Sequence, residues 1–260
     1  MKNENRIKPY FKNPSYWQYK GEPILLIGGS DEDNLFQWTN TDLTNHLNLL
    51  ESVGGNYVRN TMSDRDNGNV YAFKQIELNK YDLNQWNEEY WNRLEFFLEE
   101  TEDRNIIVQL TLWDQWDLTV QKLWDIHPWN PNCNVNYESK DLNSKSSFFH
   151  TVTDNNEKVM YYQKKYIKKL LETTLNYDHV LYNINNESWA GLDWENYWAK
   201  QLLSLANSQQ KKIEITTMQL HAEGSVKALC YYKDLYSFVD ISQINQDANG
   251  STGQGGIGIC

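Results

Sequence analysis

Cysteine, histidine and long apolar runs are all scarce in this 260-residue sequence. The three cysteines form no CxxC pair, which excludes a zinc ribbon or a disulfide framework as the main architecture. The five histidines show no HExxH or comparable ligand spacing, so the sequence predicts no metal site. A literal GxGxxG match at 253–258 lies two residues before the last residue. Because only two residues follow this match, no helix can follow it to bind a pyrophosphate, and no cofactor is predicted.

Positively charged residues are outnumbered by negatively charged ones, 24 to 35, and apolar segments of membrane length are absent. The net charge of −11 argues against nucleic acid as a partner and disfavours polyanionic substrates. No apolar run approaches the roughly 20 residues that cross a bilayer, so no membrane partner is expected. The first nine residues lack the apolar stretch of a signal peptide. The compartment stays open, because the sequence fits a cytoplasmic protein and equally a secreted or periplasmic one from which a signal was removed.

Aromatic and amide side chains, by contrast, are abundant, with 11 Trp, 17 Tyr and 31 Asn. Together they suit a site that stacks on sugar faces and hydrogen-bonds hydroxyl groups, although a compositional bias of the source genome explains the asparagines equally well. Hydrophobic residues make up 40% of the sequence, which is enough for a sizeable core. The length predicts one domain over residues 1–260.

Short apolar runs rich in β-branched residues alternate with amphipathic stretches along the chain. Strands are predicted at 23–30, 56–60, 105–113, 179–187, 212–217 and 238–244. Helices are predicted at 41–53, 82–103, 155–177, 194–209 and 225–235, with Trp86, Tyr90, Trp91, Trp194 and Trp198 as core residues. This alternation predicts an α/β fold with a parallel sheet, preceded by a small hairpin at 10–23.

Functional side chains of a parallel α/β sheet lie where the strands end, in a barrel and in an open sheet alike. The predicted strands are apolar, but they end in polar and aromatic residues, and this contrast is the strongest functional signal. Glu187 follows Asn186 at the fourth strand end, where a glutamate can protonate a glycosidic oxygen while the asparagine binds a neighbouring hydroxyl. The long segment 114–154 has no clear periodicity and is expected to be an active-site loop.

The segment Leu181–Trp189, with the sequence LYNINNESW, resembles the Asn-Glu acid/base motif of the clan A glycoside hydrolases. These are retaining glycosidases built on a (β/α)8 TIM barrel. Arg59 closes the second strand, where those enzymes carry an arginine that orients the catalytic carboxylate. Trp113 and Asp114 close the third strand, where aromatic and polar residues line the sugar site. The sequence near the N-terminus, from residue 13 to residue 29, is similar to the start of cellulase-like and apiosidase-like members.

The resemblance implies a retaining glycosidase that acts on an oligo- or polysaccharide, with Glu187 as general acid/base. The residues expected around the substrate are Asn186, Arg59, Trp113, Asp114, Trp116, Trp189, His221, Gln243 and Asn245. Structural roles remain alternatives for some residues. Arg59 could be an ordinary ion-pair partner, Trp116, Trp124 and Trp129 could form a loop core, and His221 could be an incidental polar residue.

The number of strands departs from the family pattern. Only about six βα units are predicted, whereas the barrel has eight, and the family's nucleophilic glutamate closes the seventh strand. Glu214 and Asp240 lie within predicted strands and Asp247 lies in the tail, so none of them replaces it. We therefore expect a barrel that is truncated before strand seven and lacks its nucleophile, and no hydrolysis by the 260-residue chain itself.

Two other functions fit the same residues. A non-catalytic carbohydrate-binding barrel would use the aromatic loops without needing Glu187. An open, doubly wound α/β protein with a small ligand fits six strands better than eight, and the strand order distinguishes it from a barrel. The oligomeric state and the sugar stay open.

Overall fold

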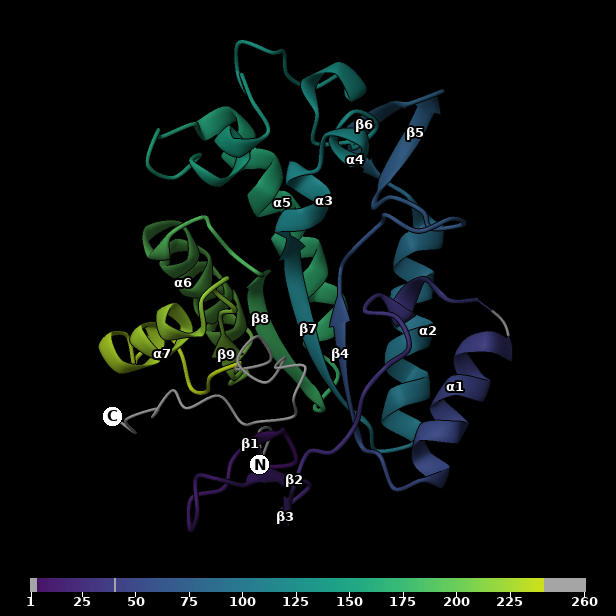
Figure 1. Cartoon of the computed structure of the whole chain (residues 1–260), viewed down its shortest axis with the longest axis vertical. Coiled ribbons are helices and arrows are strands. Elements are labelled where there is room, and N and C mark those ends of the chain that lie inside the picture. Colours follow the sequence, from purple (N-terminus) through teal and green to yellow (C-terminus); the bar gives the residue numbers. More distant parts are fainter. Residues whose placement is uncertain (1–3, 40, 241–260) are drawn as a thin grey trace, which may run out of the picture.

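The computed structural model describes residues 4–39 and 41–240, and a four-stranded parallel sheet runs through its centre (Figure 1). The strands of this sheet are β4 (Tyr57–Thr61), β7 (Ile107–Asp114), β8 (Val180–Asn186) and β9 (Ile215–Thr216). They lie side by side in chain order, and Gly28 forms a parallel bridge to Tyr57 at the outer side of β4. A doubly wound sheet reverses its strand order, whereas a barrel does not. The doubly wound alternative is therefore wrong, and the order is that of a (β/α) barrel.

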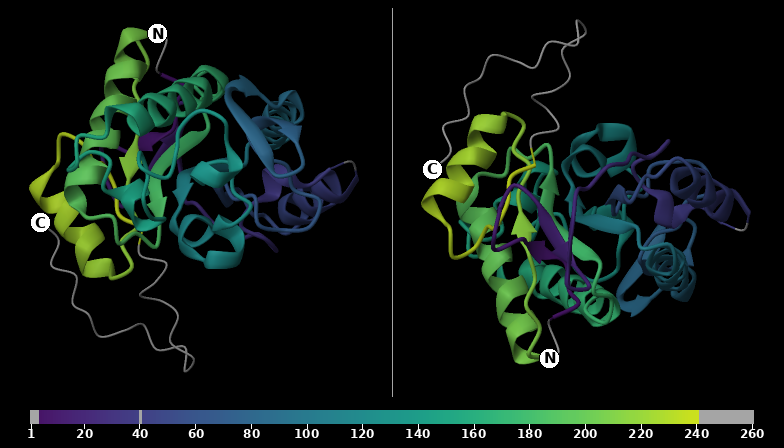
Figure 2. Two further views of the ribbon diagram at one scale, coloured as in Figure 1. Left: turned by 90° about the horizontal axis from the view of Figure 1, so that it is seen from above. Right: turned by 90° about the horizontal axis from the view of Figure 1, so that it is seen from below.

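Helices follow the strands and pack on the sheet (Figure 2). They are α1 (Thr41–Ser52), α2 (Glu88–Asp103), α5 (Glu157–Thr174), α6 (Leu192–Ser208) and α7 (Ala222–Tyr231). Asn87 and Asn156 cap α2 and α5, because each side-chain oxygen accepts a hydrogen bond from a backbone N–H of the first turn. Every residue of β7 and β8 is buried, which explains their nearly continuous apolar sequences. None of the described helices combines the length and hydropathy that crossing a membrane requires.

An aromatic core fills the space between the sheet and the helices. Tyr90, Trp91, Trp194 and Trp198 are at most 1% exposed, as predicted. Trp86 is only half-buried and lies on a strand, so its assignment to a helix was wrong.

That strand belongs to a hairpin that the sequence analysis missed. β5 (Phe73–Glu77) pairs antiparallel with β6 (Lys80–Trp86) around Asn79, whose φ is 53°. Helix α2 therefore begins at residue 88 and not at 82. The reason is local, because the cap residue Asn87 can start the helix only after the strand has ended.

The two ends of the described chain also differ from the prediction. The hairpin expected at 10–23 is a three-stranded meander of β1 (Lys8–Pro9), β2 (Trp17–Tyr19) and β3 (Glu22–Ile24). The run 23–30 continues only as the single bridge at Gly28. A Cβ at that glycine would lie 1.8 Å from the Tyr57 carbonyl oxygen, so the close pairing requires glycine.

The last predicted strand, 238–244, lies partly outside the described residues. Residues 238–240 form no strand but run beside β9, where the Thr216 hydroxyl donates to the Phe238 carbonyl at 2.8 Å.

The segment 114–154 lies at the carboxyl end of β7 and consists of short helices joined by turns and irregular backbone (Figure 1). It contains α3 (Gln115–Thr119), α4 (Gln121–Trp124) and two 3-10 turns, Pro131–Cys133 and Ser146–Phe149. Their apolar side chains, including Trp129 and Phe148, join the aromatic core. The lack of a long period in the sequence reflects these short elements.

Candidate active site

Arg59 and Asn186 come from different strands and meet at the carboxyl end of the sheet. Nη2 of Arg59 donates a 3.3 Å hydrogen bond to the side-chain oxygen of Asn186. The amide nitrogen of Asn186 in turn donates to Oδ1 of Asp114 at 3.5 Å. Because the amide accepts on one side and donates on the other, its orientation is fixed. The structure therefore brings together three residues that the sequence analysis placed in the site.

Glu187 follows directly where β8 ends. Its φ of 48° is the left-handed conformation that residues other than glycine and asparagine rarely adopt. The next residue, Ser188, is held on both sides, since its N–H donates to the Met218 carbonyl at 2.8 Å and its carbonyl accepts from Leu220 at 3.2 Å. Backbone strain of this kind, held by ordered neighbours, clusters at functional sites. The Glu187 side chain is partly exposed.

Two exposed indoles flank the same strand ends. Trp116 is 56% exposed and Trp189 is 64% exposed. Gln115 links their segments, because its side-chain oxygen accepts from the Trp189 N–H at 2.6 Å and from the Asn185 amide at 3.3 Å. Both tryptophans are therefore largely accessible to solvent beside Glu187's segment.

Asp240 is a site residue that the sequence analysis missed. One of its carboxylate oxygens lies 3.9 Å from Nη1 of Arg59 and accepts a 2.6 Å hydrogen bond from Gln109. Gln109 is itself oriented by the Tyr57 hydroxyl, which donates to it at 3.0 Å. The prediction had placed Asp240 inside a strand, whereas the described backbone at this residue is not a strand. No short motif marks it, since only the fold brings it to Arg59.

A buried ionic cluster supports the end of β7. The Arg65 guanidinium contacts the carboxylates of Asp33, Asp114 and Asp117, the last at 3.2 Å. Burial raises the pKa of Asp114, and the nearby Asp117 carboxylate adds to the effect while Arg65 opposes it. Burial likewise raises the pKa of Asp117. Within residues 4–39 and 41–240, no three His, Cys, Asp or Glu side chains are grouped to hold a metal ion.

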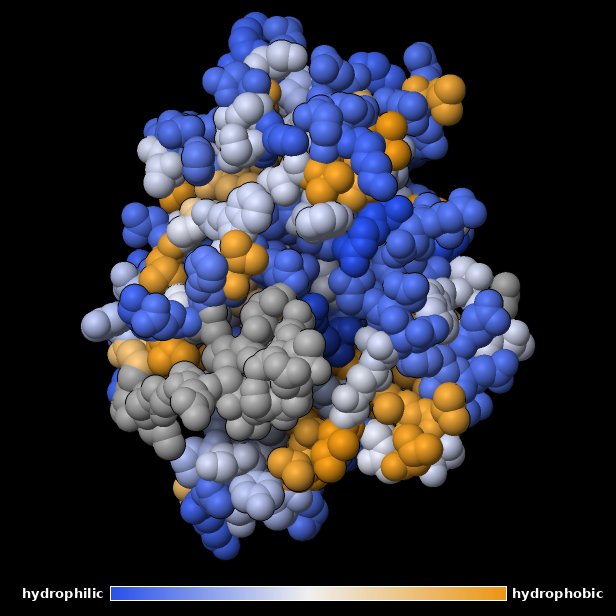
Figure 3. All heavy atoms as spheres, viewed as in Figure 1, coloured by the Kyte–Doolittle hydropathy of each residue, from blue (hydrophilic) through white to orange (hydrophobic). Residues whose placement is uncertain are grey.

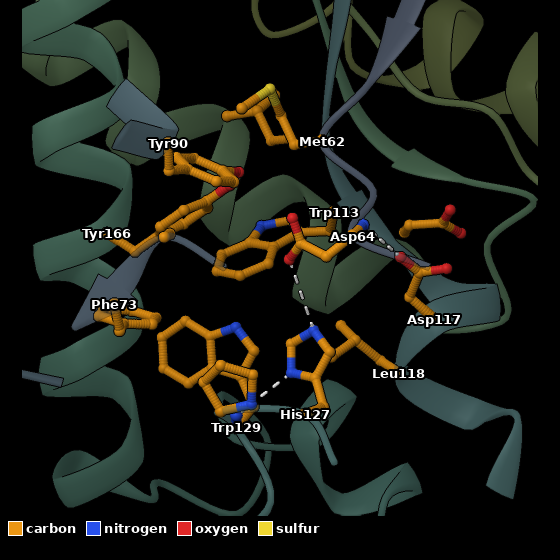
Figure 4. Close-up of a pocket in the computed structure, with 14 residues that line it drawn as sticks. Met62, Asp64, Phe73, Tyr90, Trp113, Asp117, Leu118, His127, Trp129 and Tyr166 are labelled. Atoms are coloured by element: carbon orange, nitrogen blue, oxygen red, sulfur yellow. Dashed lines mark hydrogen bonds and ion pairs between the residues drawn. The ribbon is translucent and has the colours of Figure 1, made fainter. Parts of the chain in front are cut away.

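A small cavity of about 30 Å³ lies beside this cluster (Figure 4). His127 Nε2 faces Asp64 at 4.0 Å, and its Nδ1 accepts a hydrogen bond from the Trp129 N–H at 3.2 Å, which leaves the ring proton on Nε2. Burial lowers the pKa of His127 to about 3 and raises that of Asp64. Tyr90 and Tyr166 also line the cavity, whose volume suits about one water molecule.

Glu195 of α6 is a second carboxyl group that the sequence analysis missed. It is fully buried and accepts hydrogen bonds from the Thr217 hydroxyl and the Gln219 amide, which stand in the segment after β9. Burial raises the pKa of Glu195 to about 7 even though these hydrogen bonds oppose the shift. Gln219 forms a bridge to Ser188, so Glu195 supports the segment that follows Glu187.

The remaining predicted residues have other environments. Trp113 is 2% exposed, and its ring packs among rings that include Tyr166, Trp194 and Trp198, so it is a core residue and has no face for a sugar. Trp124 and Trp129 are buried too, which favours the loop-core alternative for both. His221 is exposed at the start of α7. Gln243 and Asn245 lie outside the described residues.

Neither a protein-family model nor a curated protein sequence matches this chain. Solved structures do match it in fold. A Bacteroides vulgatus protein described provisionally as a glycoside hydrolase aligns over 84% of this chain and 39% of its own, with a TM-score of 0.60 and 13% identity. A family 5 mannosidase from Rhizomucor miehei aligns over 84% and 56%, with a TM-score of 0.57 and 13% identity. The β-mannanase of the blue mussel Mytilus edulis aligns over 83% and 64%, with a TM-score of 0.51 and 14% identity.

At these identities the likeness establishes the fold. The chain spans between 39% and 64% of the length of these three structures. Its sequential parallel strands, with helices between them, correspond to part of their barrel. The described chain therefore has the (β/α)-barrel fold of these structures, over a part of their length.

Proposed function

We propose that the protein is a retaining glycoside hydrolase in which Glu187 is the general acid/base. The observation that carries the proposal is the position of Glu187 at the end of β8, in a left-handed backbone, directly after an asparagine that Arg59 fixes. Active sites of (β/α)8 barrels lie at this end of the strands. The likeness of the fold to solved glycoside hydrolases supports the same function.

In the first step of the proposed reaction, Glu187 donates its proton to the glycosidic oxygen as the bond from that oxygen to the anomeric carbon breaks. A nucleophilic carboxylate forms the new bond to the anomeric carbon. In the second step the Glu187 carboxylate takes a proton from water, the water oxygen attacks the anomeric carbon, and the bond to the nucleophile breaks. We place the nucleophile on a seventh strand, which is not among the strands of residues 4–240.

The neighbouring residues orient these groups. Asn186 binds the sugar hydroxyl next to the scissile bond, and Arg59 fixes Asn186 and supplies positive charge for the nucleophile. Asp114 acts as a positioning residue through its contact with Asn186. We further propose that residues 1–260 belong to one catalytic domain without completing it, and that the segment 114–154 borders the site and contributes Trp116.

The substrate we propose is an oligo- or polysaccharide, with mannosides as the first class to test. The solved neighbours include a mannosidase from Rhizomucor miehei and the β-mannanase of the blue mussel, and a mutant of the former was determined in complex with mannosyl-fructose. The exposed rings of Trp116 and Trp189 provide faces on which pyranose rings can stack.

Replacement of Glu187 by Gln in the complete natural protein tests the proposal. We expect turnover of mannooligosaccharides, whose leaving groups need protonation, to fall by about 10²–10⁴-fold. For activated aryl mannosides, whose leaving groups need no protonation, the rate of the first step should fall less. Azide can replace water as the attacking group without a general base, so it should restore the rate of the second step. Glu223→Gln changes an exposed glutamate on α7 in the same way and should leave turnover intact.

A different outcome would identify the non-catalytic alternative. If the unmodified protein binds mannooligosaccharides without cleaving them, and Glu187→Gln binds them equally well while Trp116→Ala does not, the barrel is a carbohydrate-binding module. Undiminished cleavage by Glu187→Gln would instead refute the role of this glutamate alone.

A further inference from the structure

A second polar pocket lies at the same end of the sheet but shares no residue with the site around Glu187. It is open, with a volume of about 500 Å³, within the range of about 300–1,000 Å³ that small-molecule sites span. Its walls are formed by the segment 32–39, which follows the bridge at Gly28, by the start of α1, by the loop after β4 and by Arg93 of α2. Hydrophilic residues prevail on this side of the molecule (Figure 3).

The floor of this pocket is held rigidly. The Gln37 amide donates to Asp64 at 3.0 Å and to the Val70 carbonyl at 2.9 Å, and its oxygen accepts from Arg93 at 3.1 Å. Asn34 is 1% exposed and donates to Asp66 at 2.7 Å. Because these side chains are already fixed, a ligand would not have to order them on binding.

Other lining groups have hydrogen-bonding capacity to spare. The Asn69 amide nitrogen is buried and has no hydrogen-bond partner among the described residues. Asn45 and Asp66 also line the pocket, and both are exposed.

Trp38 gives the pocket an apolar wall. Its ring is half-buried and makes an edge contact with His46, with centroids 5.4 Å apart, which fixes the indole plane. The carboxylates of Glu32, Asp42 and Asp66 outnumber the one guanidinium among the lining residues, that of Arg93, so anionic ligands are disfavoured. One aromatic face among amides and carboxylates is the chemistry that recognises a neutral polyol.

We propose that this pocket is a second carbohydrate site, which binds one or two neutral pyranose units of a saccharide chain without cleaving them. The inference rests on the pocket itself and does not need Glu187 to be catalytic. In a hydrolase, the site would hold a long chain beside the active centre. Its effect would then be seen with polymers and not with short aryl glycosides.

Calorimetric titration of the complete protein with mannohexaose and cellohexaose tests the proposal, in a Glu187→Gln background that prevents cleavage. Asn45→Arg puts a long side chain into the pocket from an exposed position of α1. Leu49→Arg adds the same charge at a 64% exposed position of the same helix outside the pocket. We expect Asn45→Arg and Trp38→Ala each to weaken one binding event by about tenfold or more, and Leu49→Arg to leave it unchanged.

In the catalytically intact protein, Asn45→Arg should slow cleavage of soluble mannan but not of an aryl mannoside. Binding of at least one neutral hexasaccharide that depends on Trp38 supports the site even if no substrate is cleaved. Unchanged affinity and stoichiometry in both Asn45→Arg and Trp38→Ala would overturn it, as would binding of oligoglucuronate or oligoglucosamine alone.

Discussion

The guanidinium of Arg59 donates to the side-chain oxygen of Asn186 at 3.3 Å, although 127 residues separate the two in the chain. Strand β7 lies between their strands, so the arginine reaches across one strand end to the next. It also lies 3.9 Å from Asp240. A planar guanidinium donates in fixed directions, and it can therefore hold both partners in one geometry.

From this contact we predict that Arg59→Met lowers kcat/KM on the substrate by about 10²-fold or more, mainly through kcat, because Asn186 loses its fixed orientation. Arg59→Lys keeps the charge but not the planar fork, and should recover only part of the loss. Steady-state kinetics of both variants, with thermal unfolding as a check on folding, give the result. Equal kcat for Arg59→Met and the unmodified protein would show that the contact is only structural.

Trp113 and Trp116 should respond to substitution in opposite ways. Trp113 is buried in the aromatic core, so Trp113→Ala should cost about 3–5 kcal/mol of unfolding free energy. Trp116→Ala removes a 56% exposed ring and should leave stability nearly unchanged while it raises KM for oligosaccharides. Urea unfolding and kinetics of the two variants separate the roles. A stable Trp113→Ala protein with a raised KM would restore the sugar-binding role to Trp113.

The sequence predicted the parts of the fold that depend on hydrophobic period. β7 and β8 are buried on both faces and read as apolar runs, and α1, α5 and α6 have one apolar face each. The β5–β6 hairpin escaped detection because Trp86 and Tyr90 are four residues apart, which extended the helical pattern backwards into a strand. Asn79, which turns the hairpin, and the cap Asn87 were the local signals.

Some residues of the candidate site could likewise be predicted from the sequence, and others could not. Asn186 and Glu187 were found because a short motif stands at a strand end, and Arg59 because it closes another. Asp240 and Glu195 reach the site only through the fold, and neither has a sequence signal of its own. Trp113 stands at a strand end as well, but strand position alone does not tell whether a ring points to the core or to the site.

The Arg65 cluster leads to a prediction about stability. Arg65→Met leaves the carboxylates of Asp33, Asp114 and Asp117 without their shared counter-charge, and should destabilise the fold by about 3–5 kcal/mol at pH 8. The loss should shrink at pH 5, because carboxyl groups whose pKa is raised take up protons there. Lys168→Met, which breaks an exposed pair with Glu172 one turn along α5, is the control and should cost below about 1 kcal/mol. A loss independent of pH would contradict the electrostatic explanation.

Glu195 makes stability depend on pH in a direction opposite to that of most carboxyl groups. Its pKa is about 7 in the folded protein, against an ordinary value of 4.5, so between these values the folded state binds more protons than the unfolded state. Stability is therefore highest below pH 4.5 as far as this group is concerned, and it falls as the pH rises toward 7. The full shift corresponds to a cost of about 3 kcal/mol above pH 7.

Glu195→Gln should remove this cost, because a neutral amide can still accept from Thr217 and Gln219 through its oxygen. We expect the variant to match the unmodified protein at pH 5 and to exceed its unfolding free energy at pH 8, both measured by urea denaturation. Glu223→Gln removes an exposed carboxylate and should leave the difference between the two pH values unchanged. If Glu195→Gln shows the same loss between pH 5 and pH 8 as the unmodified protein, Glu195 is ionised within the fold. Glu195 would then be a buried carboxylate, stabilised by the hydroxyl of Thr217 and the amide of Gln219, and not a neutral acid.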